Sequence, residues 1–367
     1  MKRYSCVRMV VFAGLSTGSC LFAQLPGPPN WTVGPLKLSG LLDVYGNYTP
    51  NHPASRTLPF RNFDIRTDGL SLNMGKFTVE HDPAPVGFKL DFGFGRAFDL
   101  FNFQDHASGF DSLRYLPQAY LSLRPANGKG LQIDIGKFYT SAGAELTETH
   151  LGWNYSRGLL YTNGPYYHFG VRAAKPVNSR WTAGVQLVNG WNNVEDTNAG
   201  KTVGLTSALS LGKLSWLVNY YGGSEPVPEA NGMRHFVDQV VTFNPTEKIQ
   251  TYLNIDYGHQ RLAGDGNRAQ WAAVGAAARF QLSTNWAVSP RLEYFKDSDG
   301  FITGTPQGLK AFTFTVERKW QEGLIARTEY RHDWSSHPIF ERGATLNARK
   351  HGDTFVIGMV AFFGSKP

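Results

Sequence analysis

The sequence has little cysteine and no long hydrophobic run. Its 367 residues include two cysteines, Cys6 and Cys20, and both lie within the first 20 positions. A chain that loses this N-terminal stretch has no thiol, which excludes disulfides, thiolate metal sites and a cysteine nucleophile. The apolar run near the N-terminus is far shorter than the roughly 18 residues that a membrane-spanning helix requires. These absences exclude a disulfide scaffold and a helical membrane protein.

A cluster of basic residues is also absent. The 36 Lys and Arg residues against 29 Asp and Glu residues give a formal net charge of +7. The basic residues are scattered along the chain and form no motif of the kind that binds nucleic acid. We therefore expect no nucleic-acid partner.

The N-terminus has the pattern of a secretory signal peptide. Basic residues at Lys2, Arg3 and Arg8 accompany a short apolar region, "MVVFAGL", and "SCLFAQ" offers a cleavage site after Ala23. A lipoprotein signal that uses Cys20 is the alternative, but "TGSC" lacks the Leu that usually lies three residues before such a cysteine. We predict three parts of the chain: a signal peptide over 1–23, a periplasmic lead-in over 24–34 that is too rich in Pro and Gly for regular structure, and one β-barrel over 35–367.

Aromatic residues (14%) and glycines (40) are abundant, and segments of alternating character recur from Leu36 onward. In "GFKLDFGFG" (87–95) the even-numbered residues from Phe88 to Phe94 are apolar and point to one side of an extended chain, whereas Lys89 and Asp91 point to the other. Similar segments of about ten residues include "KLSGLLDVYGN", "LQIDIGKF", "IQTYLNIDYG" and "GDTFVIGMVAFF". In an outer-membrane barrel the apolar side faces lipid and the polar side faces a wet lumen.

The links between these segments alternate in length. Seven are short, at Asp82–Pro85, Pro125–Gly130, "PVNSR", Gly212–Lys213, "NPTEK", "STN" and "WQEG". Eight are long, around residues 49–68, 99–113, 140–165, 190–201, 222–234, 259–269, 296–307 and 333–352. We therefore predict an all-β, up-and-down antiparallel transmembrane β-barrel of about 16 strands, with short periplasmic turns, long extracellular loops and both termini in the periplasm. A soluble β-propeller is the alternative, but its blades repeat every 40 to 50 residues with a signature that is not found in this sequence.

Several long stretches also resemble the putative β-barrel porin-2 family, the OmpL-like group of bacterial outer-membrane proteins. They include "FDIRTDGLSLNMGKFTVEHDPAPVGFKLDFGFG", "PQAYLSLRPANGKGLQIDIGKFYTSAGAE", "NYSRGLLY", "GVRAAKPV", "VNGWNN" and "EYRHDWS", in the order of the family and over nearly the whole mature chain. The resemblance implies a porin-like barrel in the outer membrane. It transfers no substrate and no catalytic residue. The chain departs from barrels of this kind at its end, because "GSKP" follows the last aromatic residue, Phe363.

Two functions suit such a barrel. The first is passive diffusion of small polar solutes or ions, because about sixteen strands enclose a lumen wide enough for water. The second is an outer-membrane hydrolase, a protease or lipase. Its best local candidate is "RHDWSSH", with His332, Asp333, Ser335, Ser336 and His337. Neighbours this close in sequence rarely converge as a catalytic set, so we predict a channel without enzymatic activity, cofactor or metal.

Two groups of residues are candidates for the pore. The inward faces of three strands hold charged residues, and we predict that they line the lumen: Lys89, Asp91, Arg291, Glu293, Arg327, Glu329, Arg331 and Asp333. For the charged residues of "SPRLEYF" and "IARTEYRHD", the alternative role is an ion-pair network between strands that stiffens the barrel wall. The link over 140–165 either folds inward as a constriction or stays an ordinary surface loop. Its charged residues Glu145, Glu148 and Arg157 are the constriction candidates.

The expected partners follow from the barrel. They are outer-membrane lipid, the diffusing solutes or ions, and the barrel-assembly machinery. Outward apolar faces suit both lipid and another barrel, so a homo-oligomer remains an alternative to a monomer.

Overall fold

The computed structural model describes residues 31–364, except 108, 110, 197, 199, 226–231, 263–266 and 322. The predicted signal peptide, with both cysteines, lies outside the described residues. No helix among the described residues is long and apolar enough to cross a membrane.

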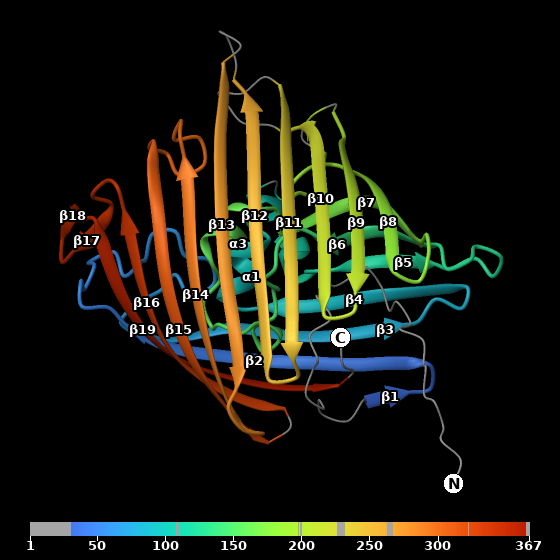
Figure 1. The fold of residues 1–367 in the computed structure, drawn as a ribbon, viewed down its shortest axis with the longest axis horizontal. Helices are drawn as coiled ribbons and strands as arrows, with labels where there is room; N and C mark the ends of the chain where they lie inside the picture. The colour runs from blue at the N-terminus through green and yellow to red at the C-terminus, as the bar shows by residue number, and fades with distance from the viewer. Residues whose placement is uncertain are drawn as a thin grey trace.

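Sixteen antiparallel strands form one closed barrel (Figure 1). They are β2 (Leu36–Tyr48), β3 (Gly69–His81), β4 (Val86–Phe94), β5 (Ala119–Leu123), β6 (Gln132–Tyr139), β7 (Tyr167–Pro176), β8 (Trp181–Val188), β9 (Thr202–Leu211), β10 (Leu214–Ser224), β11 (Met233–Thr246), β12 (Ile249–Arg261), β13 (Arg268–Gln281), β14 (Trp286–Asp297), β15 (Gln307–Gln321), β16 (Leu324–Ser335) and β19 (His351–Gly364). Each strand pairs with its neighbours in the chain, and β19 closes the barrel by pairing with β2. The predicted number and arrangement of strands are confirmed.

Short and long links alternate as the sequence predicts, with boundaries that differ by a few residues. The two-residue turn Gly212–Lys213 joins β9 to β10. The residues that flank this turn, Leu211 and Leu214, are paired across the two strands. Ser39 of β2 pairs with Gly364 of β19, so the first and last barrel strands meet at the end that carries the short turns.

The long links contain the remaining elements. Those between β4 and β5 are α1 (Arg96–Phe101), α2 (Phe103–Ala107) and the 3₁₀ turn η1 (Asp111–Tyr115). Those between β6 and β7 are the 3₁₀ turn η2 (Thr149–Leu151) and α3 (Leu159–Asn163). A hairpin of β17 (Phe340–Arg342) and β18 (Thr345–Arg349) lies between β16 and β19. Figure 1 shows α1 and α3 inside the ring of strands.

A short strand lies where the sequence predicts an irregular lead-in. β1 (Trp31–Val33) pairs with the first three residues of β2. The Trp31 ring also lies 4.7 Å from the Phe363 ring of the last strand. The prediction is therefore wrong at these positions, because the free edge at the start of β2 and an aromatic contact order the chain locally.

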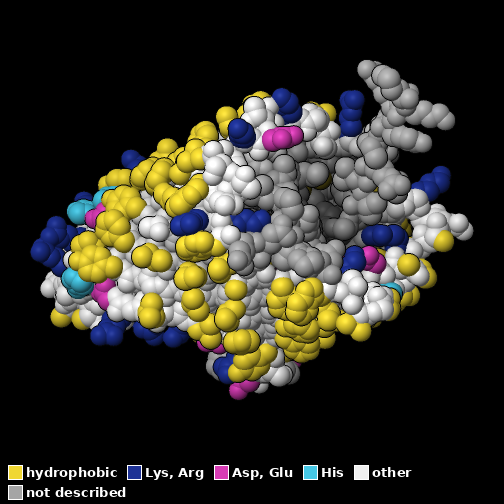
Figure 2. Space-filling model, turned by 90° about the horizontal axis from the view of Figure 1, so that it is seen from below, with side chains coloured by type: hydrophobic (Ala, Val, Ile, Leu, Met, Phe, Trp, Pro, Cys, Tyr) yellow, Lys and Arg dark blue, Asp and Glu magenta, His cyan; other side chains and the backbone are white. Residues whose placement is uncertain are grey.

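Apolar side chains lie on the outer face of the wall and polar side chains on its inner face, as the alternation predicts. On β4, Phe92 and Phe94 are 47% and 51% exposed, whereas Asp91, which precedes Phe92, is fully buried. Figure 2 shows apolar side chains in large patches on the outer surface. The packed core lies inside the barrel, where Leu159 and Leu160 of α3 contact Trp271 and Phe295 of the wall.

We expect Leu292→Lys to destabilise the barrel by about 2 to 4 kcal/mol, because Leu292 points outward near the middle of β14, where a cation would meet the bilayer interior. Reversible unfolding from lipid vesicles measures the cost. Leu292→Met is the control. A cost for the Lys variant no greater than that of the Met variant would contradict lipid exposure of this face.

Candidate functional site

The link between β6 and β7, residues 140–166, folds into the barrel and is called here the inserted segment. At its start, Ser141 Oγ donates a hydrogen bond to Asn219 Oδ1 of β10 (2.7 Å). Near its middle, the Tyr155 hydroxyl donates to Asp43 Oδ1 of β2 (2.8 Å). β10 and β2 lie eight strands apart, half of the circumference. The inserted segment therefore crosses the lumen between opposite walls.

Three arginines of β14 and β16 bind the backbone of the inserted segment. Each donates to a main-chain carbonyl oxygen: Arg327 to Thr149 (2.5 Å), Arg291 to Ser156 (2.8 Å) and Arg331 to Arg157 (2.7 Å). Arg327 also donates to the carbonyl oxygen of Gly152. An irregular backbone has no ladder to satisfy its carbonyl groups, so the wall supplies the donors instead.

Two carboxylates of the same strands bind the backbone N–H groups. Glu329 accepts from Tyr155 N–H (2.6 Å) and Ser156 N–H (3.0 Å), and Glu293 accepts from Leu159 N–H (2.8 Å). Charge-assisted bonds of this kind are shorter and stronger than neutral ones. The alternating Arg and Glu residues of β14 and β16 thus bind both kinds of backbone group.

Ion pairs neutralise these charges. The pairs are Arg291 with Glu145 (2.5 Å) and Glu293 (3.0 Å), Arg327 with Glu317 (2.8 Å), and Arg331 with Asp333 (2.8 Å). The arginines Arg291, Arg327 and Arg331 are each at most 1% exposed. The inserted segment covers them.

The three constriction candidates take different roles. Glu145 binds Arg291 of the wall, and Glu148 binds Lys76 of β3. Burial disfavours ionisation of Glu148, but the Lys76 ammonium holds the pKa of that carboxyl below its usual value. Arg157 binds the segment itself, since its guanidinium donates to the carbonyl oxygens of Leu146 (2.9 Å), Thr147 (2.6 Å) and Tyr155 (2.6 Å).

Two remaining pore-lining candidates lie on β4. Asp91 is bound by Lys76 (3.1 Å), by Gln118 (2.9 Å) and by Thr78 (2.7 Å). Lys89 lies beside Glu80 of β3 (3.6 Å). All eight candidates point inward, and all except Lys89 belong to the charged network around the inserted segment, which Asp91 joins through Lys76. Contact of any of the eight with a solute stays a prediction.

Two glycines allow the close approach of the segment to the wall. A Cβ atom at Gly358 of β19 would lie 2.2 Å from the Tyr155 ring, and one at Gly158 would lie 2.0 Å from Glu293 Oε1. A larger residue at Gly358 would therefore displace the Tyr155 ring, and one at Gly158 would displace the Glu293 carboxylate. Asp43, Tyr155 and Gly358 were not singled out from the sequence. Alternation places Asp43 and Gly358 on the inward face, but no local signal pairs them with a distant link.

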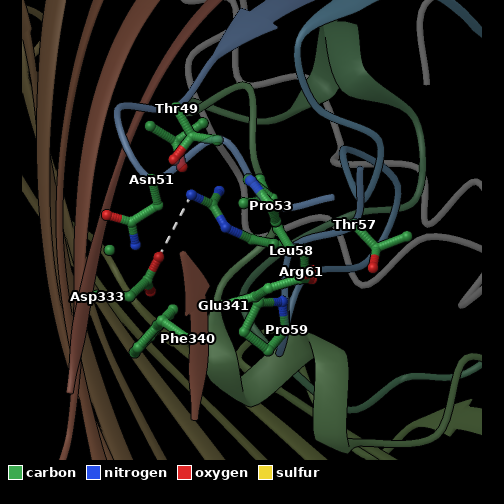
Figure 3. Close-up of a pocket in the computed structure, with 12 residues that line it drawn as sticks. Thr49, Asn51, Pro53, Thr57, Leu58, Pro59, Arg61, Asp333, Phe340 and Glu341 are labelled. Atoms are coloured by element: carbon green, nitrogen blue, oxygen red, sulfur yellow. Dashed lines mark ion pairs between the residues drawn. The ribbon is translucent and has the colours of Figure 1, made fainter. Parts of the chain in front are cut away.

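The link between β2 and β3, residues 49–68, also binds the wall at the long-link end. Arg61 is nearly fully buried and contacts Asp64 (2.7 Å) and Asp333 of β16 (3.3 Å). Figure 3 shows Arg61 reaching toward Asp333 in a pocket that Phe340 and Glu341 close from the side of β17. Asp333 therefore joins this link to the wall, and its partner Arg331 binds the inserted segment.

The hydrolase candidates do not converge as one set. Ser336 Oγ lies 3.1 Å from His337 Nδ1, but Asp333, the carboxylate among the candidates, binds arginines instead of this pair. His332 points outward and binds Asp353 of β19 through Nδ1 (2.6 Å), whereas Asp333 points inward to Arg331 (2.8 Å). Ser335 donates to Gln307 (2.6 Å). Within the described part of the chain, no group of three or more His, Cys, Asp or Glu side chains could hold a metal ion.

The chain resembles known porins. A family model described as putative beta-barrel porin-2, OmpL-like, matches residues 35–363. No curated protein matches the chain.

Three solved structures share the fold at low sequence identity. The anion-selective porin from Comamonas acidovorans has a TM-score of 0.62 at 12% identity, with 89% of this chain and 99% of that chain covered. Outer-membrane expressed OmpT of Vibrio cholerae has a TM-score of 0.61 at 12% identity, with 91% and 100% covered. The outer membrane channel DcaP of Acinetobacter baumannii has a TM-score of 0.59 at 10% identity, with 92% and 99% covered.

We expect Arg327→Gln to lower the free energy of unfolding by about 3 to 5 kcal/mol, because it leaves Glu317 and several segment carbonyls with fewer partners in a buried site. Arg279→Gln is the matched control. Arg279 also binds Glu317 (2.6 Å), but it makes no contact with the inserted segment among the described residues. Equal destabilisation by the two variants would show that anchoring of the segment adds nothing.

We expect Gly358→Ala to displace Tyr155, since the new methyl group would occupy the space of the ring. The variant should melt at a lower temperature and conduct more current per channel than the wild type. Gly69→Ala is the control, because a Cβ atom there meets nothing within 4 Å. Unchanged conductance of a folded Gly358→Ala barrel would contradict the placement of Tyr155 in the constriction.

Proposed function

The chain belongs to the putative β-barrel porin-2, OmpL-like family, and from this premise we propose that the inserted segment is the constriction of its channel. The protein is a porin-like channel of the bacterial outer membrane for small polar solutes or ions. Sixteen strands enclose a lumen wide enough for water, and a segment across that lumen narrows the path. The observation that carries the proposal is the fixation of this segment to opposite walls through Asn219 and Asp43.

The path for solutes runs along the wall that the inserted segment leaves uncovered. The segment binds inward residues of β10, β12, β14, β16, β2 and β3. On the other side, inward residues of β6 to β9 line a polar pocket together with Ser141, and they include Gln132, Asp134, Arg172, Gln186 and Thr206. Arg172 and Asp134 form an ion pair (2.8 Å), so this wall offers both donors and acceptors with little net charge.

The charged candidates divide into two roles in this proposal. Lys89 and Glu80 lie on the side of the barrel next to the uncovered wall, and the Lys89 side chain keeps 13% of its surface exposed. We assign a solute-facing role to this pair. The arginines of β14 and β16 hold the constriction in place instead, because they are buried against it.

The channel function needs no catalytic group, and we propose that the protein is not an enzyme. The strongest support is the separation of the hydrolase candidates, since His332 and Asp333 point to opposite faces of β16. A screen with ester and peptide substrates on the folded barrel tests this directly. Turnover that disappears in a His337→Ala variant would overturn it.

We further propose that the long links face the cell exterior and the short turns face the periplasm, as in outer-membrane barrels generally. The belt of outward apolar residues supports contact with outer-membrane lipid. The barrel-assembly machinery is the expected partner during insertion. The same apolar surfaces also suit contact between copies of the chain.

We expect the purified protein to form channels in a planar bilayer, and a variant in which a short Gly-Ser linker replaces residues 142–164 to conduct several-fold more current, because the constriction is removed. Replacement of residues 340–349, which contain the β17 and β18 hairpin at the rim, is the control and should change conductance little. A salt gradient across the bilayer reports ion preference in the same experiment. Absence of channels from the wild type would refute the proposed function.

A further inference from the structure

The outward faces of β12 to β15 carry basic residues at one end and no acidic residue. These four strands stand side by side in Figure 1 with their long-link ends uppermost. Four exposed basic side chains lie within the last four residues of the strands at this end, and they are called here the cationic band: Arg261, Arg268, Lys296 and Lys310. The acidic residues of the same strands all point inward and are buried: Asp256, Glu293, Asp297 and Glu317.

Within the cationic band, like charges face each other. Arg261 and Arg268 are directly opposed across the β12–β13 ladder. Lys310 is two positions from Gly308, the residue opposite Lys296, so the two lysines are diagonal neighbours. Like charges opposite each other destabilise a sheet. No residue of the band forms an ion pair with a side chain that the structure describes.

The nearby carboxylates are engaged elsewhere. Asp297 accepts backbone hydrogen bonds from Phe301 (3.1 Å), Ile302 (2.9 Å) and Thr303 (2.7 Å). Asp299 accepts from the backbone N–H of Gln270 (2.9 Å). Neither carboxylate forms an ion pair with a described residue of the band, and an anion from outside the chain would offset the repulsion that remains between the basic side chains.

Aromatic neighbours place the band at the level of lipid headgroups. Lys310 lies opposite Tyr294 on one side and Trp334 on the other. Both rings are about two-fifths exposed, at 40% and 42%. Tyr and Trp are enriched where a barrel passes from the hydrocarbon to the headgroup region, and long basic side chains there extend their charges toward the headgroups.

We propose that the cationic band binds the phosphate groups of lipid headgroups in the leaflet at the long-link end of the barrel. Arginine offers a planar pair of donors that suits phosphate, and lysine adds a mobile point charge. Binding of a phosphorylated lipid removes the repulsion between Arg261 and Arg268 and fixes one side of the barrel in its leaflet. The choice of leaflet rests on the orientation given under the proposed function.

The test uses the full-length folded protein in non-ionic detergent with diphosphoryl lipid A as the probe, and native mass spectrometry counts the lipid retained. We expect the wild type to retain it. A variant with all four band residues changed to Gln should retain at least about tenfold less, since each basic side chain near a lipid surface adds to the attraction. Arg318→Gln is the matched control, because Arg318 also points outward on β15 but lies at the short-turn end beside Trp286 and Trp320. It should retain as much lipid as the wild type.

Three results would overturn the proposal: equal retention by the fourfold variant, equal retention of lipid A without its phosphates, or displacement of the lipid by an equal concentration of inorganic phosphate. The last result would assign the band to a free anion.

Heat-modified gel mobility verifies that each variant is folded. If the fourfold variant does not fold, the double variant K296Q/K310Q replaces it, with a smaller expected loss of lipid. Conductance of the variants should equal that of the wild type. A failure of lipid binding is thus separate from a failure of the channel.

Discussion

The need to satisfy an irregular backbone inside the barrel governs the structure of the pore. A strand satisfies its backbone through its neighbours, but a segment that crosses the lumen has no neighbour of that kind. Here alternating cations and carboxylates of the wall bind the backbone of the inserted segment. Arg327 binds carbonyl groups and Glu329 binds N–H groups. The inward face of β16 therefore binds the inserted segment along one path through the lumen.

This arrangement explains how so many charges are buried without a large penalty. A buried cation is costly when it is alone, yet the Arg291 guanidinium contacts Glu145, Glu293 and the carbonyl oxygen of Ser156. The buried charges of β14 and β16 are thus paired with opposite charges or with backbone groups of the inserted segment. In the proposed channel, discrimination between solutes falls to the wall of β6 to β9, where Arg172 and Asp134 pair beside amide and hydroxyl groups.

The strands were predictable from the sequence because period-two alternation is a local property. Residues two positions apart share a face, so the inward position of Asp91 and the outward position of Phe92 follow from a stretch of nine residues. Link lengths gave the number of strands for a related reason, since antiparallel neighbours need only short turns on one side. β1 was missed because its pairing depends on a free edge and on the distant Phe363 ring.

The site was less predictable, because its contacts join residues that are far apart in the chain. Alternation identified Arg327 as inward, but its partner Thr149 lies 178 residues away in a link with no regular pattern. The same alternation has a second consequence on the outer wall. Inward positions of β12 to β15 collect the carboxylates that the interior needs, so the basic residues at their outer ends have no acidic neighbour of the same face. On these four strands the basic side chains at the long-link end therefore face outward without a carboxylate on the same face, and in the proposal above the anionic groups at the edge of a membrane supply their counter-charge.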